Sequence, residues 1–155
     1  LVALICHEVA HINERHSIKL LSKNLAGYMT ISLLFSDLNG LGTVLLENAG
    51  QLHSLSYSRK YEQEADEKGL NMIINNNVNP KGIIQLFEIL EEESRIRVPE
   101  IMSTHPLTEE RKKNIKTLIS QSKYEIKTNN KLANIFEQLK NKAKKKVEMT
   151  TQGEG

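Results

Sequence analysis

The chain has 155 residues, which is the size of one domain and is enough to bury a hydrophobic core without disulfide bonds. Its 39% hydrophobic and 26% charged residues, with 3 prolines and 8 glycines, exclude collagen-like, disordered and multi-span membrane proteins. A single cysteine, Cys6, excludes an internal disulfide but leaves the redox compartment open.

The formal net charge is +2, but it is unevenly distributed along the chain. Residues 1–111 carry ten Lys and Arg against fifteen Asp and Glu, whereas residues 112–146 carry eleven against two. Such a basic block can attract nucleic acid or an anionic membrane, and nucleic-acid binding through it would depend steeply on salt. Because no nucleic-acid motif accompanies it, we interpret the block as a solvated helix face and expect no nucleic-acid partner.

Apolar residues recur at helical spacing in the first segment, which predicts one long helix from Leu1 to about Asn24. The apolar segment that follows, residues 25–52, is interrupted by polar residues and glycines before it reaches the roughly 20 residues needed to span a bilayer. The favoured interpretation of residues 25–52 is therefore a helical lid over the cleft of the molecule.

Four further helices are expected in the rest of the chain. One covers residues 58–74 and ends in a run of asparagines, and the next begins after Pro80. Residues 95–104 are interpreted as a loop, Thr108 as the cap of the third helix, and residues 132–145 as the last helix. Since no long alternating segment and no internal repeat is present, the sequence predicts a mostly α fold.

The HEVAH segment at residues 7–11 matches the HExxH pattern. On a helix, His7 and His11 lie four residues apart on one face, so both imidazoles can bind one zinc ion. A catalytic zinc site leaves one position for water, and the adjacent Glu8 can take a proton from that water as general base. Apolar residues flank the pattern, and burying such polar groups without compensation is costly, which favours a metal site over a polar helix surface.

A third metal ligand is expected from Glu62 or Asp66, which also lie four residues apart on one predicted helix face. One of them can bind zinc while the other orients a histidine, and Asp66 is placed for the second task beside His7, whereas Glu64 points elsewhere. The alternative is an ordinary acidic helix face. Two histidines and a carboxylate suit zinc best, although cobalt or manganese can occupy such a site in vitro.

Three elements occur in a fixed order: HExxHxxxRH at residues 7–16, ExxxD at residues 62–66 and HPxxxxR at residues 105–111. In this order they resemble the HtpX/BepA-like family of gluzincin metalloendopeptidases, which includes the CAAX prenyl proteases. The resemblance covers about residues 1–120. It implies a mostly α, zincin-like metalloprotease core, with the family's small β-sheet largely missing from this chain.

The resemblance also implies roles for particular residues and one zinc ion per chain. Glu8 would be the general base, Asp66 and Arg111 would support the site, and the zinc ligands would be His7, His11 and Glu62. His105 matches a family histidine that either contacts zinc in a closed state or helps to stabilise the transition state. Without the resemblance, a histidine before a proline is as readily an ordinary loop residue.

Three other candidate ligands are assigned structural roles. Cys6 points about 100° away from the metal face of the helix and is expected to be a small core residue. His16 and His53 have no partner at ligand spacing and are interpreted as structural.

The predicted organisation is a metallopeptidase core at residues 1–122 and a basic C-terminal helix with a polar tail at residues 123–155. The favoured function is zinc-dependent endoproteolysis of polypeptides in protein quality control. The alternative is a non-catalytic zinc-binding or chaperone-like domain, because we expect the family's substrate-binding strands, which precede the HExxH helix, to be absent here. The resemblance implies that the full-length protein lies in the bacterial cell envelope, in the periplasm or at a membrane, with membrane or envelope proteins as candidate substrates, while this chain itself is expected to be soluble.

Overall fold

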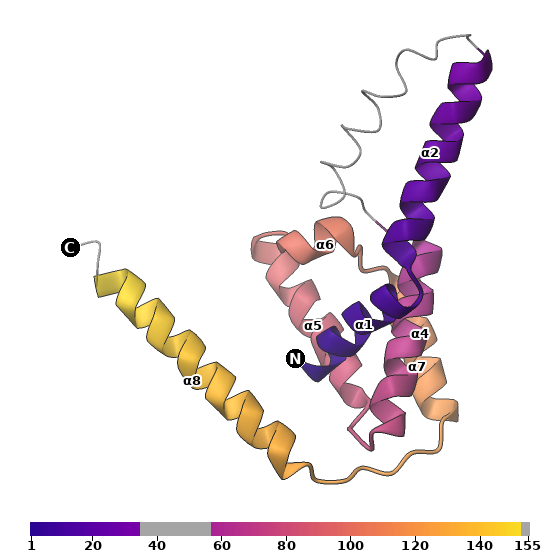
Figure 1. Cartoon of the computed structure of the whole chain (residues 1–155). Helices are drawn as coiled ribbons and strands as arrows, with labels where there is room; N and C mark the ends of the chain where they lie inside the picture. Colours follow the sequence, from indigo (N-terminus) through magenta and orange to yellow (C-terminus); the bar gives the residue numbers. More distant parts are fainter. Residues whose placement is uncertain (35–56, 153–155) are drawn as a thin grey trace.

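The computed structural model describes residues 1–34 and 57–152, and this part of the chain forms seven helices and no strand (Figure 1). The helices are α1 (Val2–Asn13), α2 (His16–Leu34), α4 (Arg59–Asn75), α5 (Lys81–Ile96), α6 (Glu100–Thr104), α7 (Glu109–Gln121) and α8 (Asn130–Gln152). The prediction of a mostly α fold is confirmed. Within the predicted lid, residues 25–34 belong to α2 and the remainder lies outside the described residues.

A small hydrophobic core joins α1, α4, α5 and α7. Its buried members are Ala3, Leu70, Ile73, Ile83, Phe87, Ile115 and Ile119. Helix α1 packs closely against α4 at Gly69, where an added Cβ atom would lie 3.2 Å from the backbone nitrogen of His7. Because Gly69 has no side chain, the two backbones approach closely enough for polar side chains of α1 and α4 to meet above the core.

Side-chain and backbone caps set the ends of α4 and α7. Ser58 accepts a hydrogen bond from a backbone N–H in the first turn of α4, and Thr108 does the same for α7. Helix α4 ends at Asn75, and Asn77 then adopts a left-handed φ of 56°, which closes the helix with backbone hydrogen bonds. The starts of α4 and α7 and the end of α4 thus lie where the sequence predicts them.

The predicted single helix over residues 1–24 is wrong, because α1 ends at Asn13 and α2 begins at His16. Between them Arg15 has a left-handed φ of 54°, and its N–H donates to the carbonyl of Ile12. A residue other than glycine is uncommon in this conformation. Because an arginine is not expected in this conformation, the sequence pattern gives no sign that the helix breaks at Arg15.

The predicted loop at residues 95–104 is also wrong. Helix α5 continues to Ile96, and residues Glu100–Thr104 form the short helix α6 directly after Pro99. A proline of fixed φ followed by an acidic residue favours the start of a helix. Helix α6 ends immediately before His105.

Residues 122–129 connect α7 to helix α8, which stands apart from the other helices in the view of Figure 1. Its apolar side chains Leu132, Ile135, Phe136 and Leu139 are partly exposed and line a groove with residues of α1 and α5. The helix is longer than the predicted 132–145, and the division of the chain at residue 122 stays a prediction. Among residues 1–34 and 57–152, no helix has the length and apolar character needed to cross a membrane.

Candidate metal centre

Helix α1 directs two histidines toward α4. His7 and His11 are 8% and 3% exposed, and their Nε2 atoms lie 3.1 Å apart. The side chain of Glu8 is 45% exposed, and its Oε1 lies 3.7 Å from Nε2 of His105. Glu8 is therefore beside His105 and accessible from solvent, while His7 and His11 are buried.

Helix α4 directs two carboxylates toward the same place. Glu62 is completely buried, with Oε1 3.3 Å from Nε2 of His11 and Oε2 3.4 Å from Nε2 of His7. Asp66 lies on the other side of the His7 ring, with Oδ1 2.9 Å from Nδ1. The two carboxylates thus contact opposite nitrogens of His7.

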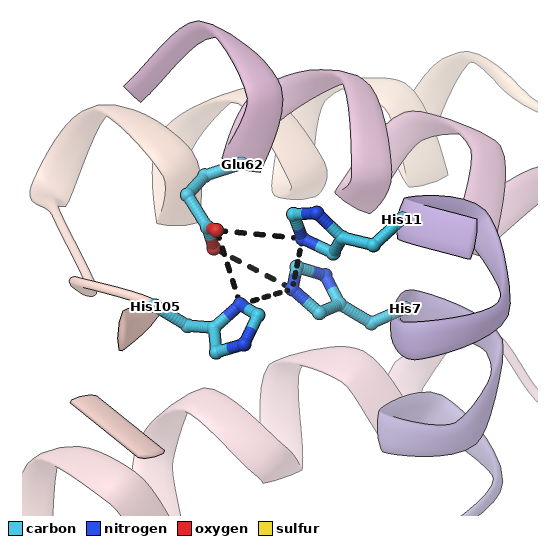
Figure 2. A group of neighbouring side chains, drawn as sticks. All are labelled: His7, His11, Glu62 and His105. Carbon is cyan, nitrogen blue, oxygen red and sulfur yellow. Dashed lines mark hydrogen bonds and ion pairs between the residues drawn. The ribbon is translucent and has the colours of Figure 1, made fainter. Parts of the chain in front are cut away.

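His105 completes the cluster from the segment between α6 and α7 (Figure 2). Its Nδ1 lies 3.0 Å from Oε1 of Glu62 and 3.3 Å from Nε2 of His7. One potential ligand atom from each of His7, His11, Glu62 and His105 lies within 4.8 Å of the other three. The structure therefore brings the three predicted ligands and His105 to one point.

The spacing of these atoms fits a zinc ion. In a tetrahedral site with bonds of about 2.0–2.1 Å, neighbouring ligand atoms are about 3.3 Å apart. Five contacts between nitrogen and oxygen atoms of the cluster measure 3.0–3.4 Å, and the four ligand atoms all lie within 4.8 Å of one another. Oε2 of Glu62 is buried, and it lies 3.4 Å from Nε2 of His7 and 2.7 Å from Nη1 of Arg111.

The protonation of His7 also favours a cation in the cluster. The carboxylate of Asp66 only accepts hydrogen bonds, so a neutral His7 carries its proton on Nδ1 and directs a bare Nε2 toward Glu62. A bare nitrogen and a carboxylate oxygen repel each other at 3.4 Å unless a proton or a metal ion lies between them. A metal ion between Nε2 of His7 and Oε2 of Glu62 would remove this repulsion.

In the metal-free protein, the pKa shifts favour a proton in the place of the metal ion. Burial lowers the pKa of His7, but hydrogen bonds with Asp66 and Glu62 outweigh burial and raise it to about 9. Burial favours the neutral form of Glu62, but hydrogen bonds from the three histidines hold its pKa well below the usual range. For His11, burial lowers the pKa. Without a metal, these contacts favour the protonated form of His7.

Arg111 contacts two carboxylates of α4, Glu62 and Asp66, and is itself buried. Its Nε and Nη2 donate to Asp66 at 2.6 and 2.7 Å, and its Nη1 lies 2.7 Å from Oε2 of Glu62. Nη1 also donates to the carbonyl of Pro106 at 2.9 Å. The arginine thus links the HPxxxxR segment to α4 and orients Asp66 against His7.

Two further residues lie against the cluster although sequence analysis did not assign them to it. His16, interpreted there as structural, is completely buried, and its Nδ1 lies 2.9 Å from Nδ1 of His11. The ring of Tyr57 lies 4.2 Å from that of His11, and its hydroxyl is 2.5 Å from Oγ of Ser17. For His16, the sequence feature that indicates a place near the cluster is its position at the end of the HExxHxxxRH element. Tyr57 has no such signal, because its position depends on tertiary packing.

Cys6 packs against the hydrophobic core and lies partly buried, as expected from its helix face. Burial raises the pKa of its thiol, which disfavours the thiolate that a metal would bind. His53 lies outside the described residues.

Comparisons with known proteins find similarity to proteases. The model of Peptidase family M48 matches residues 1–119. The chain is 26% identical to the putative beta-barrel assembly-enhancing protease of Vibrio cholerae over 124 aligned residues, which cover 72% of this chain and 25% of that protein. It is 25% identical to the beta-barrel assembly-enhancing protease of Yersinia pestis over 135 residues, covering 79% of this chain and 28% of the relative. For the Escherichia coli K12 protein of the same name, identity is 27% over 128 residues, with 72% and 25% covered. The chain spans about a quarter of the length of these curated relatives.

Proposed function

The chain belongs to peptidase family M48, and from this premise we propose that it is the catalytic domain of a zinc-dependent endopeptidase. The observation that carries the proposal is the cluster of three imidazoles and one buried carboxylate, with Glu8 beside it. This donor set suits zinc better than magnesium or calcium, which prefer oxygen ligands throughout.

Each residue of the proposed site has its own role. His7, His11 and Glu62 hold the zinc ion, which when bound supplies a Lewis acid that polarises the scissile carbonyl and acidifies water. Glu8 takes a proton from the attacking water on its exposed carboxylate and donates it to the leaving amine. Asp66 and Arg111 keep His7 and Glu62 in place.

His105 supports a closed state of the proposed site. Its Nδ1 is at ligand distance from the atoms of Glu62 and His7, so it occupies the fourth corner of the cluster. In this state no corner is left for a substrate carbonyl. When His105 moves away, its imidazole is free to donate a hydrogen bond to the oxygen of the reacting carbonyl.

The same four-residue arrangement favours a second candidate function, a non-catalytic zinc-binding or chaperone-like domain. Structural zinc sites are closed by four protein ligands, whereas catalytic sites keep one position open. Hydrolysis of an unfolded polypeptide such as casein by the zinc-loaded chain separates the two functions. Turnover that stops on chelation supports the peptidase, and full zinc occupancy without turnover supports the binding domain.

One zinc ion per chain is expected after gentle purification, and none in the His7→Ala/His11→Ala variant. The double substitution removes two of the imidazole donors and leaves too few ligands for tight binding. Elemental analysis of both proteins measures the outcome. Absence of metal from the unaltered chain when zinc is freely available would refute the proposed function.

Zinc binding is expected to strengthen with pH, because zinc and a proton compete for Nε2 of His7. The pKa of His7 is raised to about 9, so at neutral pH zinc must displace a proton from the folded protein. Below that pKa the apparent affinity should rise about tenfold per pH unit. Competition with a chromophoric chelator at pH 7 and 8, corrected for the chelator's own protonation, tests this. An affinity that stays constant would show that His7 is not protonated in the metal-free chain.

The proposed substrates are polypeptides of the bacterial cell envelope. Support comes from the names of the relatives, which describe proteases that enhance β-barrel assembly. The corresponding location of the full-length protein is the periplasm or the membrane surface.

A further inference from the structure

His16 forms a second layer behind His11. Its ring is completely buried, and its Nδ1 lies 2.9 Å from Nδ1 of His11, the nitrogen that faces away from the cluster. Its Nε2 lies 3.3 Å from Oε2 of Glu64. We propose that His16, oriented by Glu64, is a positioning residue that keeps the proton of His11 on Nδ1 and so leaves Nε2 bare for the metal. This inference rests on the metal site of the proposed function.

The direction of the hydrogen bonds follows from the chemistry of the three side chains. The Glu64 carboxylate has no proton to donate, so Nε2 of His16 carries the proton that it accepts. A neutral His16 then has a bare Nδ1, which can only accept. Consequently Nδ1–H of His11 donates to His16, and Nε2 of His11 is left with a lone pair.

The local backbone holds His16 in this position. Arg15, in its left-handed conformation, ends α1 and lets α2 start at His16, so that the ring turns back toward His11. The ring also stacks on Tyr61 of α4, with centroids 4.6 Å apart and planes at 14°. A strained residue next to a buried polar pair is typical of functional sites.

The two metal-facing histidines of α1 are therefore oriented in different ways. His7 donates directly to a carboxylate, Asp66, which is itself buried and held by Arg111. His11 reaches its carboxylate through an intervening imidazole, and the side chain of Glu64 is 32% exposed. The outer carboxylate on the His11 side is thus partly accessible to solvent, whereas Asp66 is buried.

A matched pair of substitutions at His16 tests the proposal. In His16→Asn, Oδ1 is bonded to Cγ as Nδ1 is in histidine, so an acceptor for His11 is retained. In His16→Phe, the ring shape and the stacking on Tyr61 are retained, but the acceptor is lost. We expect His16→Phe to weaken zinc binding by about 10- to 100-fold in a chelator competition, and His16→Asn to stay close to the unaltered chain. A folded His16→Phe variant that binds zinc as tightly as the unaltered chain would overturn the proposal.

Substitutions on α4 test whether Glu64 acts by orienting His16 or only by its negative charge near the metal site. Glu64→Gln replaces a pure acceptor with an amide that can also donate, so it should weaken zinc binding less than His16→Phe does. Glu67→Gln is the control, because Glu67 is exposed on the same helix and bonds only to Asn114 among the described residues. Equal zinc affinities for Glu64→Gln and Glu67→Gln would remove Glu64 from the proposal.

A spectroscopic measurement keeps the proposal testable if a variant fails to fold or if the chain takes up no zinc. The long-range ¹H–¹⁵N spectrum of the metal-free, unaltered chain reports which ring nitrogen of each histidine carries a hydrogen. We expect His11 to carry it on Nδ1, and a hydrogen on Nε2 would overturn the proposal. Failure of the unaltered chain to bind zinc refutes the proposed function instead, and the spectrum still decides the protonation of His11.

Discussion

Replacing Glu8 with glutamine is expected to reduce peptide hydrolysis by about 10²- to 10⁴-fold, the usual contribution of a general base. The amide cannot take a proton from the attacking water. Zinc content should not change, because Glu8 lies outside the four-residue cluster, with its nearest carboxylate oxygen 3.7 Å from His105 and its side chain 45% exposed. Cleavage of casein or a quenched fluorescent peptide, together with elemental analysis, measures both quantities.

The matched control for this prediction is Glu14→Gln. Glu14 follows α1 and forms surface ion pairs with Lys19 and Lys68, away from the cluster. Its replacement removes the same charge and should leave hydrolysis unchanged. If Glu8→Gln retained full turnover with zinc bound, another group would have to activate water, and the assigned role of Glu8 would be wrong.

The spacing of ionisable residues along two helices made much of the site predictable. A separation of four residues places His7 above His11 and Glu62 above Asp66, whatever the rest of the fold is. The position of Asp66 at Nδ1 of His7 follows from the same logic, since a metal-ligating imidazole donates its other N–H to an acceptor. These relations are local, and local periodicity is what a sequence encodes most directly.

Other parts of the site depend on long-range packing. His105 meets Glu62 where Arg111 joins the HPxxxxR segment to α4, and a histidine before a proline carries no local sign of this contact. The position of His16 depends on the break at Arg15, and the position of Tyr57 against His11 depends on how the chain enters α4. An arginine, unlike a glycine, does not indicate a left-handed residue, so the apolar periodicity predicted a helix that continues past Arg15.

Replacing Arg111 with methionine is expected to lower the free energy of unfolding of the metal-free chain by about 3–5 kcal/mol, the usual cost of removing one partner of a buried ion pair. Arg111 is 3% exposed, and Asp66 and Glu62 are 3% and 0% exposed, so the substitution leaves two buried carboxylates without their cation. Methionine fills a similar volume, which keeps the loss of packing small. Urea unfolding in the presence of a chelator measures the change without a contribution from zinc.

The neighbouring residue provides the control. Lys112 pairs with Glu91 and Glu109 at the surface, so Lys112→Met removes the same charge without leaving a buried carboxylate and should change stability far less. Arg111→Lys should recover only part of the loss, because one ammonium cannot reproduce the guanidinium fork that contacts both oxygens of Asp66. Equal effects of Arg111→Met and Lys112→Met would contradict the buried network. In that case the carboxylates would have to be protonated or solvated in the folded chain, and Asp66 could not orient His7 as a hydrogen-bond acceptor.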